Sequence, residues 1–269
     1  MFILKTKQEQ LDFRLFEAII DDNTKMIKAL LKRGADPNAS RYLLNNNNNS
    51  LRMSLINDAA WRGRTEAVRL LAAAGADIND GNNYIHLPPL YLAINNMKLE
   101  TARLLADLGA DLNPRNFAFE TPLHLYAKQG ALEQLMFTIG LGADVNLLDQ
   151  SHMTPLYCAC AMGMHVKKVI VEALVSAGAD PNIADSYGTT PLIRLASCGY
   201  TGMMKTLIRA GADISAENIF RHTALSKLKE QHPDKYNRFI QNAVVKSRQQ
   251  TLKREDSRRS RRCEPDFDI

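Results

Sequence analysis

An all-α solenoid of helix-turn-helix repeats is the fold class that this 269-residue sequence predicts, and two observations lead to it. The first is a five-residue signature, Gly-Ala-Asp-x-Asn, whose glycines are 41, 34, 33, 36 and 33 residues apart, a period of about 33 with insertions. The second is a short segment of the type Thr-Pro-Leu-x, which stands 21 residues before the signature in four repeats and 24 residues before it in another. The signature begins at Gly34, Gly75, Gly109, Gly142, Gly178 and Gly211, and at the last of these Ser215 replaces the asparagine.

The residues of each unit account for a pair of helices. A Thr-Pro pair such as Thr121-Pro122 places a hydroxyl at a helix N-cap and proline at the first helical position, where the missing N–H costs nothing. Small residues such as Ala59 and Ala60 then let this first helix approach its neighbour closely. A second helix carries an apolar stripe, for example Leu104 and Leu105, and the glycine of the signature ends it with a left-handed cap.

These two motifs together resemble the ankyrin repeat, with its Thr-Pro-Leu-His-x-Ala pattern and 33-residue period. The resemblance covers roughly residues 8 to 245, and it implies short β-hairpin loops between the repeats. It also implies that His124, in the histidine position of the motif, bonds to the backbone of the neighbouring hairpin. The other repeats depart from the pattern and place Asn57, Tyr91, Tyr157, Ile193 and Ser226 at that position.

One ankyrin repeat domain is expected over residues 1–245, followed by a basic, disordered tail at residues 246–269. The repeats fall near residues 8–38, 54–79, 88–113, 121–146, 154–182 and 190–215, with a C-terminal cap at 223–245. The first repeat lacks the Thr-Pro segment, and its helices are expected at Leu11 to Asp21 and Thr24 to Lys32. The eight-residue excess that contains Asn45 to Asn49 is interpreted as an extended hairpin loop, with a dedicated binding role as the alternative.

The net charge of +5 belongs to the tail. Residues 246–262 hold eight basic side chains against two acidic ones, so the remainder is slightly acidic. The basic side chains include Arg254, Arg258, Arg259, Arg261 and Arg262. Such a run fits an import receptor, a nucleic acid or an anionic lipid surface, and it also fits a solvated tail without a function. The final residues, Phe267-Asp268-Ile269, offer a further alternative, a ligand for domains that capture a C-terminal carboxylate.

Catalytic and metal-binding classes are not expected. The sequence contains no phosphate-binding glycine motif and no local signature of a Ser/His/Asp or Cys/His site. Cys158 and Cys160 are two residues apart on one predicted helix and therefore point away from each other, so they and His165 do not predict a metal site. We expect no cofactor and reduced cysteines. No apolar run approaches the ~18 to 20 residues of a membrane helix, and a cytoplasmic monomer is the default expectation.

The resemblance implies that partners bind at the hairpin turns and at the exposed edge of each first helix. Aromatic residues stand at four of the five turns, and exposed apolar side chains often mark an interaction site. The alternative is that each ring folds back on the next hairpin. The predicted partner-binding residues are Trp61, Arg62, Tyr84, Asn95, Asn96, Phe117, Lys128, Gln129, Met162, Tyr187 and Phe220.

The sequence thus predicts a non-enzymatic scaffold or adaptor that binds a partner protein on its concave face and hairpin turns. The alternative is a host-directed bacterial effector, or a recruitment protein that uses the basic tail to reach a membrane surface or the nucleus. In those cases the location would be the host cytosol or the nucleus rather than the cytoplasm of the source cell.

Overall fold

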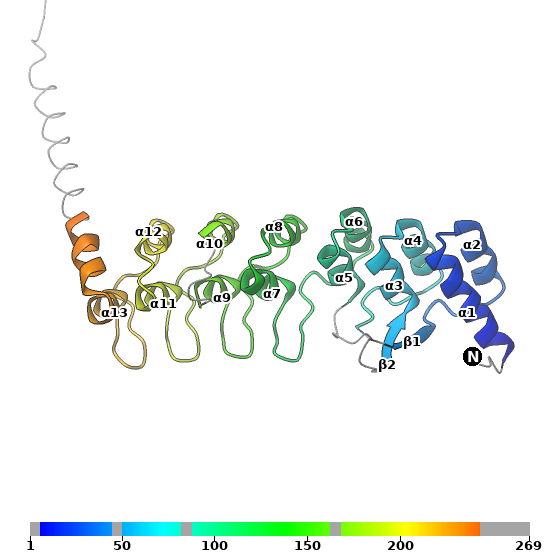
Figure 1. Ribbon diagram of the computed structural model, residues 1–269, viewed down its shortest axis with the longest axis horizontal. Coiled ribbons are helices and arrows are strands. Elements are labelled where there is room, and N and C mark those ends of the chain that lie inside the picture. The colour runs from blue at the N-terminus through cyan, green and yellow to red at the C-terminus, as the bar shows by residue number, and fades with distance from the viewer. Residues whose placement is uncertain (1–5, 45–49, 82–87, 162–167, 243–269) are drawn as a thin grey trace, which may run out of the picture. The chain divides into compact units, whose positions relative to one another are not determined.

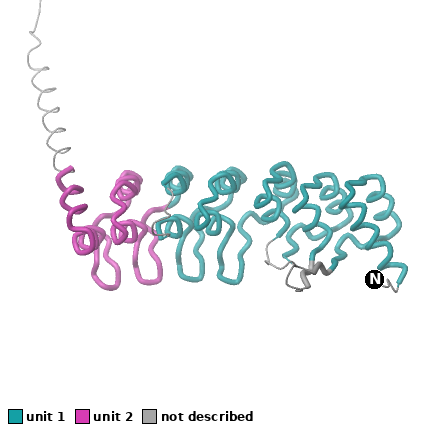
Figure 2. Tube along the Cα trace, in the orientation of Figure 1, with its two compact units in different colours: residues 1–179 teal, residues 180–269 magenta. Residues whose placement is uncertain are grey.

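The computed structural model describes residues 6–44, 50–81, 88–161 and 168–242 of the chain (Figure 1). The chain divides into two compact units, residues 1–179 and residues 180–269 (Figure 2). The predictions for Tyr84, Met162 and the basic tail lie outside the described residues.

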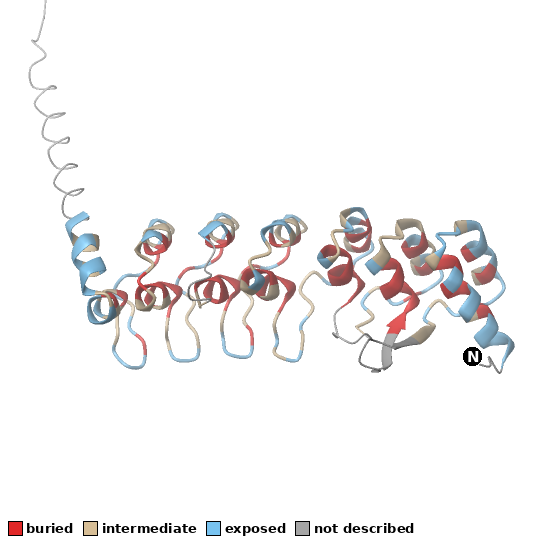
Figure 3. Cartoon of the chain, viewed as in Figure 1, coloured by how far each residue is buried: buried red, intermediate tan, exposed pale blue. Residues whose placement is uncertain are grey.

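Unit 1 is a stack of helix pairs in two layers (Figure 1). The first helices of the pairs form the inner layer, next to the hairpin loops: α1 (Lys7–Ile20), α3 (Leu55–Arg62), α5 (Pro89–Asn95), α7 (Pro122–Gln129) and α9 (Pro155–Ala161). The second helices form the outer layer: α2 (Thr24–Lys32), α4 (Thr65–Ala73), α6 (Leu99–Asp107), α8 (Leu132–Gly140) and α10 (Lys168–Ser176). The inner helices carry most of the buried surface (Figure 3).

Unit 2 repeats this plan. Helix α11 (Pro191–Ser197) packs against both α12 (Thr201–Arg209) and α13 (Ala224–Gln231), and residues 233–242 are also helical. In this last helical stretch Tyr236, Phe239 and Ile240 are half-buried.

The excess residues of the first loop form a two-stranded antiparallel ribbon. Strand β1 (Ser40–Leu44) pairs with β2 (Ser50–Ser54), and Ser40 lies opposite Ser54. Residues 45–49 between the strands lie outside the described part. The insertion therefore lengthens one hairpin and leaves the helix pairs on either side unchanged in kind.

The helix ends follow the predicted capping chemistry. The side chain of Thr190 accepts a hydrogen bond from the Ile193 amide at 3.3 Å, with Pro191 at the first helical position. Helix α1 begins at Lys7, one turn before the predicted Leu11, because Thr6 and Glu9 form a reciprocal capping box with N–H to oxygen distances of 3.1 and 3.0 Å.

Four of the signatures link one repeat to the next through the side-chain oxygen of their asparagine. The aspartate of the signature accepts a hydrogen bond from the amide of its own asparagine, as in Asp111 and Asn113 at 2.8 Å. The asparagine side chain then reaches forward, and Asn113 Oδ1 accepts from the Asp144 amide of the next signature at 3.0 Å. The same forward bond joins Asn38 to Asp77 at 2.9 Å, Asn79 to Asp111 at 2.8 Å and Asn182 to Asp213 at 2.7 Å. We call this series the asparagine ladder.

The ladder explains how the array starts and stops. No signature precedes that of Asp36 in the sequence. The Asp36 amide instead donates to Asp12 Oδ1 of α1 at 2.8 Å, while Gln8 donates to the Gly34 carbonyl at 3.0 Å. At the other end no signature follows residue 215. Ser215 turns back and donates to Asp213 Oδ1 at 2.6 Å. Ser215 thus replaces asparagine in the one signature after which no further signature follows to donate a hydrogen bond.

One junction of unit 1 departs from regular stacking. Tyr126 of α7 occupies the position that Ala59, Ala93 and Ala159 fill in other repeats of unit 1, and its side chain is fully buried. Its ring stacks on Tyr91 of α5 with centroids 5.7 Å apart and the planes 7° from parallel. Helix α5 also contacts α8 at this junction. A ring in place of a methyl group here makes the contact between α5 and α7 an aromatic one.

Replacing Asn113 with alanine should lower the free energy of unfolding by about 1 kcal/mol, because the Asp144 amide loses its protein acceptor. Urea unfolding followed by circular dichroism measures the change. Ser215→Asn is the matched control and should cause no comparable loss or gain, since no following signature can receive the longer side chain. Equal effects of the two substitutions would show that the ladder adds nothing to stability.

Candidate functional site

The predicted helix-edge residues of unit 1 stand at the C-terminal ends of inner helices. Trp61 and Arg62 end α3, Asn95 ends α5, and Lys128 and Gln129 end α7. These helices stop because the next residue or the one after it has a positive φ: 75° at Gly63, 56° at Met97 and 67° at Gly130. The turns hold the last side chains of neighbouring repeats in equivalent positions, as predicted. Asn96 is the C-cap residue of α5.

Arg62 is held in place from two sides. Its Nε donates to Asp58 Oδ2 at 2.9 Å, one helical turn earlier, and its guanidinium carbon lies 5.3 Å from the centre of the Trp61 ring. Asp58 is only 1% exposed, so solvent does not reach the carboxylate end of the Asp58–Arg62 ion pair. The Trp61 side chain remains 43% exposed. Tryptophan and arginine are among the residue types most enriched at binding hot spots, and here the two are already arranged.

Asp58 is a functional candidate that the sequence reasoning missed. The equivalent position holds Leu92, Leu125 and Cys158 in the other repeats of unit 1, so a carboxylate there interrupts an apolar pattern. It also forms an ion pair with Arg41 of β1 at 3.5 Å. An aspartate among leucines with an arginine four residues later was the available signal.

Lys98 also lies beside this pair. A side chain at Gly63 would meet the Lys98 stem at 2.8 Å, which shows that the lysine crosses the glycine that follows Arg62. The crossing requires glycine at position 63, both for space and for its φ of 75°. The stem of a second basic side chain therefore lies against the residue that follows Arg62.

Two of the other helix-edge residues, Asn96 and Lys128, are engaged within the chain. Asn96 Nδ2 donates to the Leu92 carbonyl at 2.8 Å. Lys128 forms an ion pair with Glu120, which also accepts from Asn116 Nδ2 at 2.7 Å. Burial disfavours ionisation of Glu120, but the hydrogen bonds from Lys128 and Asn116 outweigh it and keep its pKa below the ordinary value. Lys128 is therefore already neutralised by a neighbour.

The hairpin turns share one backbone design. An Asp or Asn begins each turn and its side-chain oxygen accepts two amides, as Asn116 does from Ala118 at 2.9 Å and Glu120 at 3.0 Å. Asp149, Asp185 and Asn218 do the same in their turns. Adjacent turns are joined by a backbone bond, from Gln150 N to Ala118 O in unit 1 and from Ile219 N to Tyr187 O in unit 2, both at 3.0 Å.

This design directs the predicted aromatic residues outward. Phe117 in unit 1 is 81% exposed, and Tyr187 and Phe220 in unit 2 are 57% and 61% exposed. Ile219 is also exposed beside Phe220, and the sequence reasoning did not select it. These exposed fractions show that the three rings are not buried against a neighbouring hairpin.

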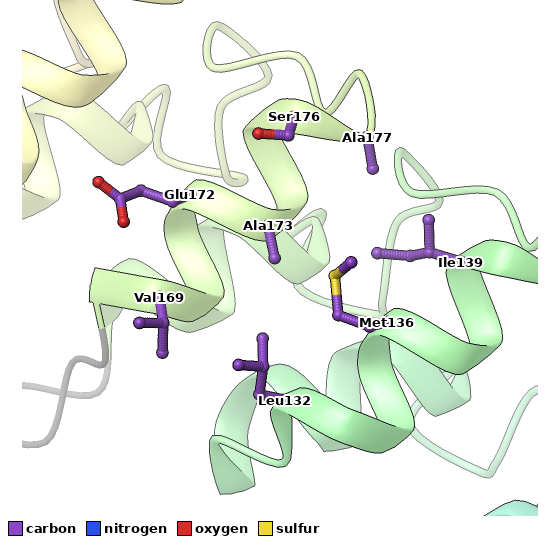
Figure 4. A pocket seen from close by; sticks show the side chains of 8 residues that line it. All are labelled: Leu132, Met136, Ile139, Val169, Glu172, Ala173, Ser176 and Ala177. Atoms are coloured by element: carbon purple, nitrogen blue, oxygen red, sulfur yellow. The ribbon is translucent and has the colours of Figure 1, made fainter.

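An apolar groove lies on the outer face of unit 1, away from these residues (Figure 4). It has a volume of about 510 Å³ between α8 and α10. Leu132, Met136 and Ile139 line one side and Val169 and Ala173 line the other, with Glu172 at its edge. The Glu172 carboxylate is paired with Lys168 at 3.1 Å.

The cysteines and acidic residues form no metal-binding group within the described residues. Cys158 and Cys160 are both buried on α9, and burial raises the pKa of the Cys158 thiol to about 12. A thiol with this pKa is protonated near neutral pH and is a poor nucleophile.

Comparison with known families settles the fold family. The family of ankyrin repeats in three copies matches residues 15–116 and 123–218. The chain belongs to the ankyrin repeat family. Ankyrin repeat domains are generally protein–protein interaction modules, and the fold is generally a non-enzymatic scaffold. Among the described residues, no helix has the length and apolar character needed to cross a membrane.

Solved structures show the same architecture. The ankyrin repeat domain of Bcl-3, a member of the IkappaB family, is 24% identical with a TM-score of 0.69, covering 84% of this chain and 97% of that one. An ankyrin repeat domain from Acinetobacter baumannii AYE is 30% identical with a TM-score of 0.60, covering 75% of this chain and 99% of the other. No curated protein matches the sequence.

The ankyrin motif histidine makes the contacts that the resemblance implies. His124 Nδ1 accepts from the Thr121 amide at 3.1 Å and lies 2.8 Å from the Thr121 hydroxyl, so Nε2 carries the proton and donates to the Met153 carbonyl at 2.9 Å. In the second repeat Asn57 replaces the histidine, and its Nδ2 donates to the Asp80 carbonyl at 2.9 Å. The eroded pattern thus keeps the link to the hairpin in this repeat.

His124 should make this ankyrin array sensitive to acid. Burial lowers the pKa of His124 below the ordinary 6.5. As the pH falls, the histidine of the unfolded chain is therefore protonated before that of the folded chain. Its contribution to stability is complete above pH ~6.5 and falls as the pH drops below that value. His124→Asn, which copies the residue of the second repeat, should lose less stability between pH 7 and pH 5 in urea unfolding. An unchanged pH dependence would refute the assignment.

Proposed function

We propose that this ankyrin repeat protein is a non-enzymatic adaptor whose partner docks on the inner-helix edges and hairpin turns. The observation that carries the proposal is the arrangement of Trp61 and Arg62, which Asp58 fixes before any partner arrives. Ordering a long side chain on binding costs about 0.5 to 1.5 kcal/mol, and a prearranged pair avoids much of that cost. The exposed aromatic residues of the hairpin turns extend the surface.

The second candidate function is recruitment through the basic tail, with the repeats as the holder of a bound protein. It rests on the charge of residues 246–262 alone. The ligand would be an anionic lipid surface, a nucleic acid or an import receptor, and the location would follow from that ligand. Binding of this kind should weaken steeply with salt, whereas contacts anchored by aromatic residues should not.

Affinity capture from cell lysate separates the two candidates. The baits are the full chain, the chain truncated after Val245, and the full chain with Trp61→Ala. Partners retained by the truncated chain but reduced about tenfold or more by Trp61→Ala would support docking on the helix edges, since truncating a hot-spot tryptophan costs about 2 kcal/mol or more.

Met136→Ala is the matched control, because Met136 is comparably exposed, at 50%, but lies in the outer groove. Partners lost with Met136→Ala and kept with Trp61→Ala would move the proposed surface to the outer face. Partners lost only with the tail would favour recruitment.

A further inference from the structure

The cluster around Asp58 carries more positive charge than it neutralises. Two guanidinium groups, Arg41 and Arg62, share the single carboxylate of Asp58 at 3.5 and 2.9 Å. The stem of a third basic residue, Lys98, lies against Gly63, which follows Arg62 in the chain. Within the part of the chain that the structure describes, no other acidic side chain pairs with these three cations. The site therefore has an excess of positive charge on its open side.

The two arginines differ in which of their N–H donors remain available to a ligand. Arg41 is inserted between repeats, with its guanidinium carbon 4.9 Å from the centre of the buried Phe16 ring, and its Nε is buried without a hydrogen-bond partner among the described residues. Arg62 uses only Nε on Asp58, and its two terminal nitrogens have no protein partner there. Because the guanidinium is a rigid fork, fixing Nε also fixes the directions in which these nitrogens can donate.

We propose that Trp61, Arg62 and Lys98 form a subsite for a carboxylate side chain in an acidic peptide segment of the partner, with Asp58 as the positioning residue. The terminal nitrogens of Arg62 would donate to the carboxylate, and Lys98 would supply the second positive charge. The exposed Trp61 ring would cover an apolar side chain next to it. This inference rests on the proposed function and names the chemistry of the partner at one point of the surface.

The neighbouring helix edges favour a peptide over a nucleic acid. A protein that follows a phosphate backbone presents a row of cations. Here the next repeat offers Asn95 and Asn96, which are neutral, and the one after it offers Lys128, which is already paired with Glu120. The excess charge is local and suits a single carboxylate.

The lone tryptophan of the chain lies in this subsite, so its fluorescence reports on occupancy directly. The full chain is titrated with the capped peptide Gly-Glu-Leu-Glu-Gly and with its isosteric Gly-Gln-Leu-Gln-Gly form. The glutamate peptide should give a saturable change that weakens as salt rises, and the glutamine peptide should give none at the same concentrations. Arg62→Gln and Lys98→Gln should each weaken binding, the former by about tenfold, as expected for a charge-assisted contact.

Asp58→Asn tests the positioning role through the sign of its effect. Removing a carboxylate makes the site more positive, so a purely electrostatic site would bind the peptide more tightly. Loss of the bond that holds Arg62 should instead weaken binding. If circular dichroism shows that this variant is unfolded, Arg62→Lys gives the same test, because it keeps the charge and loses the fork. Arg69→Gln on α4, where Arg69 pairs with Glu66 at 3.2 Å, is the control and should change nothing.

Three results would overturn the subsite. The first is equal binding of both peptides, and the second is no fluorescence change up to about 5 mM glutamate peptide, well above the 1 mM dissociation constant that corresponds to about 4 kcal/mol of binding free energy. The third is Arg62-dependent binding of a short oligothymidylate that is stronger than binding of the glutamate peptide. Each would leave the proposed adaptor function standing if partner capture still depended on Trp61. Loss of that dependence would remove the adaptor function itself. The two failures are therefore distinguishable.

Discussion

The hydrogen bond that the aspartate amide of one signature donates to the asparagine side chain of the preceding signature is the interaction on which the order of these repeats depends. A single helix pair cannot bury its apolar faces alone, so stability comes from neighbour contacts. The asparagine ladder adds direction to those contacts, because each loop offers an acceptor forward and receives one from behind, as Asn79 and Asn113 do at 2.8 and 3.0 Å. The ends are completed differently, by Asp12 and Gln8 at the start and by Ser215 at the finish.

The repeats of unit 1 that the ladder joins also place the ends of their inner helices in equivalent positions. Inner helices α3, α5 and α7 each stop within two residues of a positive φ, and the side chains at their ends occupy equivalent positions. Against that regular background one position stands out. Asp58 is a buried carboxylate at a position that holds leucine or cysteine in the other Thr-Pro-Leu repeats of unit 1, and such a group is costly unless it is paired. Two arginines pair with it, and one of them is thereby held against the exposed Trp61 ring.

Much of the fold could be predicted from the sequence because its signals are repeated. The capping role of Thr190, the left-handed glycines of the signature and the hairpin contact of His124 were all confirmed. The turns were harder to predict, because the residue with positive φ, normally a glycine, is Phe119, His152 or Arg221 in three of them. Asp58 did leave a sequence signal, an acidic residue in an otherwise apolar position with Arg62 four residues later, and it was overlooked. Its second partner, Arg41, and the contact of Lys98 with Gly63 are distant in sequence and leave no periodic signal.

Amide hydrogen exchange read residue by residue tests the asparagine ladder most directly. The amides of Asp77, Asp111, Asp144 and Asp213 stand in solvent-exposed loops, yet each donates to an asparagine at 2.7 to 3.0 Å. The account predicts that these four amides are protected well above the rate of an unstructured chain, and that the Asp144 amide alone loses protection when Asn113 becomes alanine. Exchange at the unstructured rate for all four in the unsubstituted protein would contradict it.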